Sequence, residues 1–253
     1  MPRIAVFDSG LGSVSIIEPL RQRMNLDIVY YADTASFPYG AKTPRELKRI
    51  IIETISGLRR TFEPDIVLVG SNTPSLLFPE IMDDCTFGVY PPLKRAAHIT
   101  KTKNIAILGT SAAVSGPAIF RYIRRCRLPA DILAHAVDAS MLVRLVEDGR
   151  FDDDAYCQDV ILELLGYHFA HHAVDVATLS STHLPFLRRS LESAFPNVTF
   201  LDPADEIAKT VCDRLEYRDG PASLRIFTSG SVAALSAKLA KLGIREDVVH
   251  ILL

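Results

Sequence analysis

The stretch IAVFDSGLGSV at Ile4–Val14 has a counterpart in IAILGTSAAVS at Ile105–Ser115. Each begins with a short apolar run and passes into a loop of small residues, which is typical of a buried strand that leads into a helix. A second pair repeats this relationship, because IVLVGSNTPSLLFP at Ile66–Pro79 is echoed by VATLSSTHLPFL at Val176–Leu187. The chain therefore contains two similar halves, which indicates an ancient internal duplication.

Apolar runs of strand length alternate with longer stretches of helical period along the chain. This alternation predicts an α/β fold made of two pseudo-symmetric parallel-sheet domains, each covered by helices. We assign residues 1–95 plus 206–253 to the first α/β domain and residues 96–205 to the second. The expected strands are Ile4–Asp8, Ile28–Ala32, Ile66–Gly70, Ile105–Gly109, Asp131–Ala136, Val174–Leu179 and Leu224–Thr228. The expected helices are Pro44–Phe62, Ser140–Glu147, Asp154–Leu165, Asp205–Leu215 and Ala233–Leu242.

Composition excludes several classes of protein. The 253 residues are 48% hydrophobic and 23% charged, which is ordinary for a globular protein and excludes disordered, fibrous and disulfide-scaffold chains. The formal net charge of −2 gives no general attraction to nucleic acid or to an anionic membrane. We therefore expect a small-molecule partner, with no nucleic acid and no membrane.

The N-terminus and the cysteines favour a cytoplasmic location. Met1 leads almost directly into the apolar run Ile4–Phe7, without the basic region, long apolar region and cleavage site of a secretion signal. No apolar stretch approaches the length of a membrane span. The cysteines lack CxxC spacing, which argues against a zinc site or redox pair, and we expect buried or incidental thiols. They are Cys85, Cys126, Cys157 and Cys212.

The ends of the expected strands carry residues suited to chemistry. Asp8 and Ser9 open a glycine-containing loop whose backbone N–H groups could face an anion while Asp8 takes or gives a proton. The same pattern also fits a glycine-assisted turn in which Asp8 caps a helix. In open α/β sheets, ligands bind beyond the carboxyl ends of the strands. Two facing halves would bring four such loops to one cleft, and that cleft is the predicted site.

Two further loops occupy matching positions in the two halves. Ser71-Asn72-Thr73 and Ser181-Thr182-His183 each follow a strand of the buried type, where their polar groups could hold a carboxylate beside a helix N-terminus. Either triplet alone could be a helix cap, but capping requires no such symmetry. His183 suits acid–base work near neutral pH, although a lone histidine is more often a structural group.

Other polar features have simpler explanations. The segment Tyr30–Gly40 suits either a wall of the cleft or aromatic packing under a loop. His168, His171 and His172 have a spacing that can present two imidazoles to a metal, but without an accompanying carboxylate we favour a solvated helix end. We expect no metal.

A basic run lies within the second expected domain. It consists of Arg121, Arg124, Arg125 and Arg127. Such a run could meet an acidic partner, but runs of like charge are usually solvated faces, and we assign it no function.

With these residues in view, the sequence resembles the glutamate racemases, within the wider aspartate/glutamate racemase superfamily, almost from end to end. The most specific similarity is to the family's Gly-Asp-Thr-Ala and Pro-Tyr-Gly segment, which Ala32–Ala35 and Pro38–Gly40 match. The other matching segments are Asp8–Ser13 (Asp-Ser-Gly-x-Gly-Gly in the family), Ser71–Thr73 (Cys-Asn-Thr), Leu145–Glu147 (Leu-Val-Glu), Ser180–Pro185 (Gly-Cys-Thr-His-Tyr-Pro) and Phe227–Gly230 (Tyr-Thr-Thr-Gly).

The resemblance implies a cofactor-independent enzyme in which two groups on opposite faces of the substrate remove and return its α-proton. In the family these groups are cysteines, and Ser71 and Ser181 stand in their places here. Asp8 and His183 match the helpers of the two cysteines, and Glu147 matches a further acidic residue near the site. The positions that match the substrate-binding residues are Ser9, Asn72, Thr73, Thr110 and Thr182, with Pro38, Tyr39 and Gly40 in the wall. The implied partner is a small amino acid or carboxylate, and a homodimer is expected only by analogy.

The serines change what the site can do. A thiol titrates near ~8.5 and an alcohol near ~15.7, so forming the oxygen base costs roughly 10 kcal/mol more. Uncompensated, that difference would remove most of the racemase rate, and we do not expect standard two-thiol racemisation. Ala113 and Gly116 also stand where hydroxyl residues are usual in the family.

Three interpretations follow from the sequence. The first is a diverged glutamate racemase-like enzyme that works through Asp8, His183 and the serines. The second is a non-catalytic, carboxylate- or amino-acid-binding or regulatory homologue that keeps the cleft. The third is a glutamate racemase studied as a Cys-to-Ser variant. Ala113, Gly116 and Ser180 argue against the third, because a thiol replacement would not require them.

Overall fold

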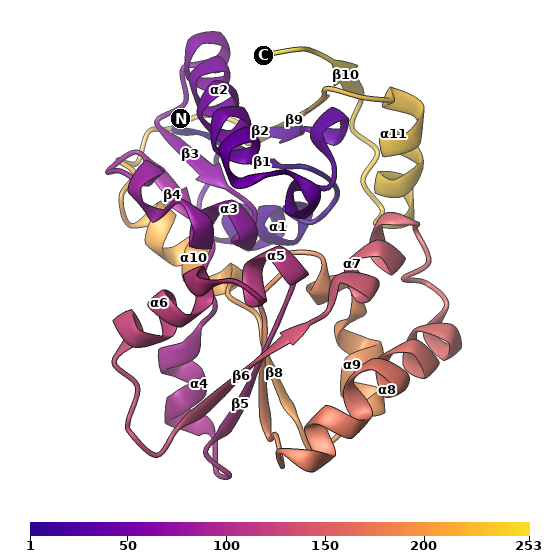
Figure 1. The fold of residues 1–253 in the computed structure, drawn as a ribbon. Coiled ribbons are helices and arrows are strands. Elements are labelled where there is room, and N and C mark those ends of the chain that lie inside the picture. Colours follow the sequence, from indigo (N-terminus) through magenta and orange to yellow (C-terminus); the bar gives the residue numbers. More distant parts are fainter. The chain divides into compact units, whose positions relative to one another are not determined.

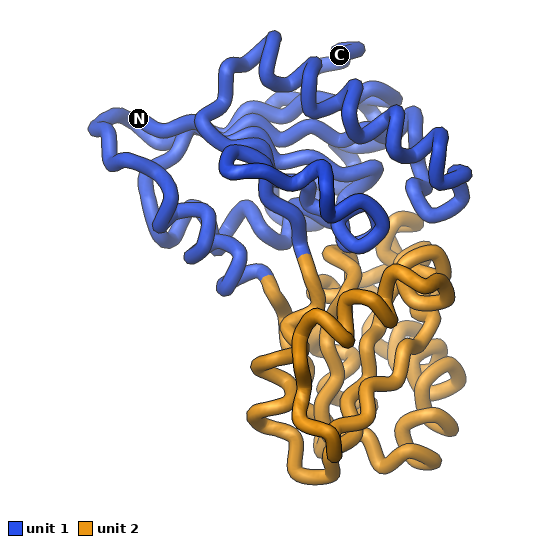
Figure 2. The backbone as a smooth tube through the Cα atoms, turned by 60° about the vertical axis from the view of Figure 1, so that its left-hand side comes forward, with its two compact units in different colours: residues 1–89, 204–253 blue, residues 90–203 orange.

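The computed structural model describes residues 1–253, which form two compact units (Figure 2). Unit 1 comprises Met1–Val89 and Ala204–Leu253, and unit 2 comprises Tyr90–Pro203. None of the helices combines the length and the apolar character that crossing a membrane requires. The chain thus leaves unit 1 once and returns to it once.

The two crossings between the units precede helices. Helix α4 (Leu93–Ile99) belongs to unit 2, where Leu93 and Ala96 are fully buried. Helix α10 (Ala204–Cys212) belongs to unit 1, where it packs against α1 (Val14–Arg23). The boundaries expected from the sequence, after residues 95 and 205, fall inside these two helices. Continuous backbone hydrogen bonding makes each helix one rigid piece, so the crossings lie before them.

Unit 1 contains a six-stranded sheet whose neighbouring strands are all parallel, in the order β10-β9-β2-β1-β3-β4 (Figure 1). Its strands are β1 (Arg3–Asp8), β2 (Asp27–Ala32), β3 (Ile66–Val69), β4 (Thr86–Gly88), β9 (Ser223–Thr228) and β10 (Val248–His250). Its other helices are α2 (Pro44–Phe62), α3 (Asn72–Leu77) and α11 (Val232–Lys241), with 3-10 turns at Thr34–Ser36, Tyr39–Ala41 and Pro79–Ile81. The central strand β1 is apolar and buried on both faces, as parallel sheets require.

Helix α2 shows why the local sequence folds as it does. Thr43 caps its N-terminus by accepting a hydrogen bond from the backbone N–H of Glu46 at 3.3 Å, and Pro44 occupies the first helical position. Leu47, Ile51 and Leu58 recur at helical spacing and are buried against one face of the sheet. The apolar stripe thus fixes α2 over the strands that lead to the predicted site.

Unit 2 repeats this plan with four parallel strands in the order β6-β5-β7-β8. Its strands are β5 (Asn104–Gly109), β6 (Leu133–Asp138), β7 (Val176–Leu179) and β8 (Thr199–Leu201). Its other helices are α5 (Ser111–Val114), α6 (Pro117–Cys126), α7 (Ser140–Glu147), α8 (Asp154–His171) and α9 (Arg188–Ala194), with a 3-10 turn at Leu184–Leu187.

The two units share one strand topology. The order β2-β1-β3-β4 in unit 1 matches β6-β5-β7-β8 in unit 2, because the first strand of each unit lies between the second and the third. This correspondence confirms the two parallel α/β domains expected from the sequence. It also makes β1 equivalent to β5 and β3 equivalent to β7, so the Asp8 loop matches the Thr110 loop and the Ser71 loop matches the Ser181 loop.

Some elements differ from their expected bounds. The strand expected at residues 131–136 is β6, which begins at Leu133 because the β5 strand that it pairs with begins at Asn104. Ile132 instead closes a turn by donating its N–H to the carbonyl of Pro129 at 3.0 Å. Helix α8 runs on past Leu165 to His171, through Gly166. The short strands β4, β8 and β10 lie at sheet edges, where little apolar patterning is needed to specify them.

Candidate active site

A histidine links a serine to a carboxylate in unit 2. Nδ1 of His183 lies 3.4 Å from Oγ of Ser181, and its Nε2 lies 2.6 Å from Oε1 of Glu147. Ser181 and His183 follow β7, and Glu147 is the last residue of α7. A Glu147 carboxylate can only accept, so it fixes the proton on Nε2 and leaves the Nδ1 lone pair facing the serine hydroxyl. This is the order of groups that activates a hydroxyl in Ser–His systems.

The Ser181–His183–Glu147 group is shielded from water. The three residues are 5%, 5% and 6% exposed. Buried polar side chains of this kind are normally hydrogen-bonded, and the low local dielectric strengthens the bonds between them. The neighbouring Ser180 is directed elsewhere, because its Oγ lies 2.8 Å from Oγ1 of Thr178. Only the second serine of the pair therefore belongs to the histidine network.

The other predicted residues of unit 2 lie at the same strand ends. Thr182 is 4% exposed, between Ser181 and His183. Thr110 follows β5 and occupies the N-cap position of α5, but its side chain makes no capping hydrogen bond. The strand topology thus gathers these positions at the carboxyl ends of β5 and β7, which are hydrogen-bonded neighbours.

In unit 1, Asp8 is the last residue of β1 and is 1% exposed. Its Oδ1 accepts a hydrogen bond from the backbone N–H of Ser9 at 2.7 Å, and its backbone carbonyl accepts from Asp33 at 2.7 Å. Ser9 is 5% exposed. The Asp8 carboxylate is thus held in a buried turn at the strand end, where it can exchange a proton with a group placed beyond the sheet.

The Ser71 loop follows β3, the neighbour of β1. Ser71 occupies the N-cap position of α3 but makes no side-chain capping bond, so the simple helix-cap explanation does not account for its hydroxyl. The Asn72 amide donates from Nδ2 to the carbonyl of Val89 at 3.2 Å, which leaves Oδ1 buried without a partner. Thr73 is 4% exposed in the first turn of the helix. A buried amide oxygen of this kind is an acceptor available to a ligand.

The loop after β2 is fastened to the end of β9. Tyr39 donates its hydroxyl to Oδ2 of Asp33 at 3.2 Å, and Ser229 donates to Oδ1 of the same carboxylate at 2.7 Å. Burial, and then the charges of Asp33 and Asp8, raises the pKa of Tyr39 well above its ordinary value, so this hydroxyl stays protonated. Pro38 and Gly40, on either side of Tyr39, are exposed. The segment is thus a loop held by hydrogen bonds to Asp33, with Pro38 and Gly40 at its surface.

Asp33 and Ser229 were not among the predicted site residues. The sequence contained a signal for both, because each lies in a segment that matches a family motif. Sequence reasoning missed them because their role is to hold the loop, and that role depends on a contact between residues 196 positions apart.

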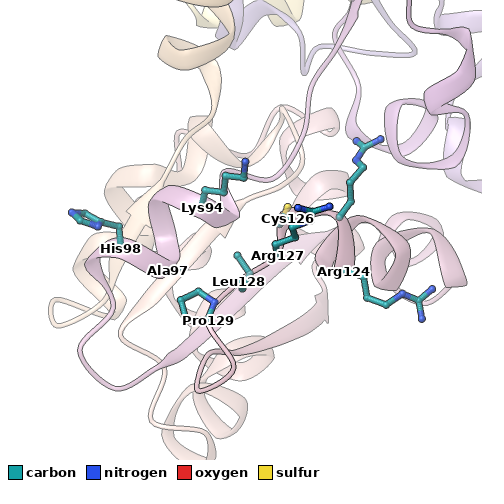
Figure 3. A pocket seen from close by; sticks show the side chains of 9 residues that line it. Lys94, Ala97, His98, Arg124, Cys126, Arg127, Leu128 and Pro129 are labelled. Carbon is teal, nitrogen blue, oxygen red and sulfur yellow. The ribbon is translucent and has the colours of Figure 1, made fainter.

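Three arginines of the basic run, Arg124, Arg125 and Arg127, line a hollow in unit 2 of about 970 Å³ (Figure 3). Lys94 and His98 come from α4, and Arg124 and Arg127 come from the end of α6 and the residue after it. The guanidinium of Arg125 lies over the rings of Tyr90 and Tyr122, with its central carbon 5.6 and 5.5 Å from their centroids. The hollow is basic, and it contains none of the predicted catalytic residues.

The cysteines do not replace the missing thiols at the strand ends. Cys85 is exposed and precedes β4, whereas the other three are buried in helices. Cys157 donates its thiol to the carbonyl of Arg150 at 3.3 Å, and burial followed by the charges of Asp153 and Asp154 raises its pKa. Ser71 and Ser181 therefore have no cysteine beside them in sequence or at the ends of their strands.

The sequence and the fold are similar to those of known proteins. No protein-family model matches the chain. It is 30% identical to the glutamate racemase of Actinobacillus pleuropneumoniae over 220 residues, which is 83% of this chain and 80% of that protein. It is also 30% identical to the glutamate racemase of Thermus thermophilus over 259 residues, which is 98% of this chain and 95% of that protein.

A solved structure extends the comparison to the whole fold. The crystal structure of glutamate racemase from Thermus thermophilus in complex with β-chloro-D-alanine matches with a TM-score of 0.83 at 28% identity, covering 99% of this chain and 96% of that one. The class that the fold and the site define is thus a pair of parallel α/β domains with hydroxyl, carboxylate and imidazole groups at the strand ends. The chain belongs to the glutamate racemase family.

Proposed function

We propose that this protein is a diverged, cofactor-independent member of the family that removes and returns the α-proton of a small amino acid or related carboxylate. The observation that supports this most directly is the buried His183, placed between Ser181 and Glu147. An imidazole titrates near ~6.5 in water, so it is a far better proton acceptor at neutral pH than a serine hydroxyl. His183 thereby offsets much of what the loss of the thiol costs.

In this proposal His183 is the base of unit 2, acting directly or through the Ser181 hydroxyl. Glu147 holds the ring by its Nε2–H and stabilises the imidazolium that forms when Nδ1 takes the proton. A relay through Ser181 passes one proton from the substrate carbon to Oγ as the hydroxyl proton moves to Nδ1, so no free alkoxide is formed. Returning the proton reverses these steps.

Unit 1 contributes a different set of groups. Asp8 is its proton-accepting side chain, and Ser71 corresponds in topology to Ser181 but has no histidine two residues on. Ser9 and Thr73 of unit 1 and Thr182 of unit 2 are hydroxyl groups proposed for the substrate carboxylate, and the unpartnered Oδ1 of Asn72 suits an ammonium group.

Because the proposed bases of the two units differ, the two enantiomers of the substrate should exchange their α-protons at different rates. Inversion requires a base on each side of the α-carbon, and the histidine network exists in unit 2 alone among the matching strand-end loops. We therefore propose faster exchange for the enantiomer whose α-hydrogen faces His183, with slow net inversion. The amino-acid ligand of the Thermus thermophilus relative supports a substrate of this class.

The test is deuterium exchange at the α-carbon in D₂O, followed by proton NMR, on D- and L-glutamate and D- and L-aspartate in separate reactions. For each enantiomer the proposal predicts that removing the base that faces its α-hydrogen, by His183→Asn for one and Asp8→Asn for the other, reduces exchange by about 10²-fold or more. Ser180→Ala is the matched control, because Ser180 is an equally buried neighbour outside the histidine network. Its exchange rate should equal that of the natural sequence.

Three other outcomes decide against the proposal. Unchanged exchange after His183→Asn and Asp8→Asn would exclude both bases. Binding of an amino acid without exchange, together with exchange in Ser71→Cys/Ser181→Cys, would favour the non-catalytic binding homologue. Full racemase activity appearing in the double cysteine protein would favour the Cys-to-Ser variant of an ordinary glutamate racemase. The cytoplasmic location and the homodimer stay predictions.

A further inference from the structure

Three histidines of unit 2 come together away from the strand-end loops. His135 lies in β6, His168 lies in the last turn of α8, and His172 is the C-cap residue of that helix. Taking one ring nitrogen from each histidine, the three nitrogens all lie within 4.8 Å of one another. The ring centroids of His135 and His172 are 4.1 Å apart, and those of His168 and His172 are 4.5 Å apart. The sequence spacing revealed only the two helical members of this group.

The ring of His135 is oriented by a neighbour on the adjacent strand. Asn104 donates from Nδ2 to the carbonyl of Thr102 at 3.0 Å, so its Oδ1 is the atom that lies 2.9 Å from Nε2 of His135. An amide oxygen can only accept, so Nε2 carries the proton and Nδ1 keeps its lone pair. An outer hydrogen bond that fixes the tautomer in this way is the usual support of a metal-binding histidine.

His168 provides an independent observation. Its Nε2 is buried and has no hydrogen-bond partner. A polar nitrogen in this position costs free energy unless it gains a partner, and a metal ion is one partner that fits a cluster of imidazoles. His171, by contrast, is exposed and stacks on the ring of Tyr167 with a centroid separation of 5.4 Å. The solvated helix end expected from the sequence thus describes His171 but not His168.

We propose that His135, His168 and His172 form a binding site for a divalent transition-metal ion, with Zn²⁺ as its preferred occupant. Imidazole nitrogen suits zinc, and three histidines with one open position make a complete ligand set. Zn–N bonds of about 2.0–2.1 Å place ligand nitrogens about 3.3 Å apart in a tetrahedron, so the site must contract around the ion. To do so, the rings of His135 and His172 must turn out of their stack. They have room to turn because all three side chains are only partly buried.

The position of the site indicates a role outside the proton-transfer chemistry. His135 is the third residue of β6, and α8 ends just before the chain enters β7. The ion would join a strand at the edge of the sheet to the end of the helix that precedes the Ser181 strand. It lies at the start of β7, whereas Ser181 follows the end of β7. Metal binding should therefore stabilise unit 2 without entering the proton-transfer chemistry.

The experiment is calorimetric titration of the full chain with Zn²⁺, using protein without a histidine tag and freed of metal by chelation. A Cys85→Ser background removes the exposed thiol as a competing ligand. We expect one bound ion and a higher thermal unfolding midpoint. His168→Gln and His172→Gln should each lose at least about tenfold in affinity, and Asn104→Ala should lose about 10–100-fold by releasing the ring of His135.

His171→Gln is the matched control, because the His171 ring packs edge-on against His172 with a centroid separation of 4.8 Å but is not one of the three proposed ligands. Its affinity should be unchanged. Co²⁺ should give the visible absorption of a four-coordinate site in the natural sequence, and that absorption should be absent from His172→Gln. Circular dichroism of each variant shows whether it is folded. The absence of binding, or equal weakening by His171→Gln and His172→Gln, overturns the proposal and leaves a stack of imidazoles.

Discussion

Oε1 of Glu147 lies 2.6 Å from Nε2 of His183, and both side chains are 6% exposed. A carboxylate at this distance settles which ring nitrogen holds the proton, and so it decides that Nδ1 is the nitrogen that can act as a base. Glu147 therefore also affects Ser181, because the Ser181 hydroxyl faces the unprotonated Nδ1. Glu147 is therefore a positioning residue. Removing its charge should disturb the tautomer of His183 while the imidazole itself stays in place.

The first prediction concerns Glu147→Gln. A glutamine amide no longer selects the tautomer by charge, so α-proton exchange should fall by about 10²-fold while His183 remains in place. Nitrogen NMR of the imidazole should show Nδ1 unprotonated in the natural sequence and mixed tautomers in the variant. This readout is independent of turnover.

Asp148→Asn provides the control for Glu147→Gln, because it removes an exposed carboxylate from the adjacent position. It should leave both the exchange rate and the His183 spectrum unchanged. Identical tautomer populations in Glu147→Gln and the natural sequence would contradict the assigned role.

A second prediction concerns the loop held by Asp33. Tyr39→Phe removes one of the two hydroxyl donors to a buried carboxylate, which should lower the free energy of unfolding by about 1–3 kcal/mol. Urea unfolding measures this difference. Tyr217→Phe is the matched control, because Tyr217 is 69% exposed and its variant should be indistinguishable from the natural sequence. Equal stability of the two variants would mean that the Tyr39 hydroxyl does not hold the loop.

Much of the fold could be predicted because its signals are local. Helix α2 has a cap, an initial proline and an apolar stripe within one segment, and its expected bounds of Pro44–Phe62 are those observed. The central strands β1 and β5 are apolar runs that end in polar loops, and the duplication was visible as a repeated pattern. The short edge strands carry no such pattern. Their position comes from pairing with a neighbour already in place, which one segment cannot reveal.

The candidate site was only partly predictable for a related reason. The strand-end position of Ser181 and His183 follows from the sequence, because one strand specifies it. Their link to Glu147 depends on how α7 packs in unit 2, across 36 positions of the chain. The same limit applies to His135, which joins His168 and His172 through tertiary structure alone. Sequence spacing identifies groups on one element, and packing decides which elements meet.

A third prediction concerns acid. Asp27 in β2 lies 2.6 Å from Nε of Arg3 and 2.9 Å from an NH2 group of Arg225, which joins three neighbouring strands. Burial raises the pKa of Asp27, but hydrogen bonds from Ser223, Arg3 and Arg225 lower it by more, so the pKa lies below 3.8. A lowered carboxyl pKa gives stability that is complete above the unfolded value and lost as the pH falls through the folded value.

Asp27→Asn should therefore cost about 1–3 kcal/mol of unfolding free energy at neutral pH. The cost should shrink as the pH falls below about 4, because the natural carboxyl then becomes neutral too. Urea unfolding across this range measures it. Glu53→Gln, which breaks an exposed ion pair with Arg49, should cost at most about 0.2–0.5 kcal/mol anywhere in this range. A cost for Asp27→Asn that does not change with pH would show that packing, not charge, is responsible.

The last prediction asks whether any native thiol is available to replace the two cysteines of the family. Burial raises the pKa of Cys126, Cys157 and Cys212, and thiols react as thiolates, so all three should be inert in the folded protein. Cys85 is exposed and should react rapidly with dithiobis(nitrobenzoate). One fast thiol is expected in the natural sequence, none in Cys85→Ser, and the rest only after unfolding. A second fast thiol in the folded protein would reopen thiol-based proton transfer, whereas its absence assigns the chemistry to imidazole and carboxylate.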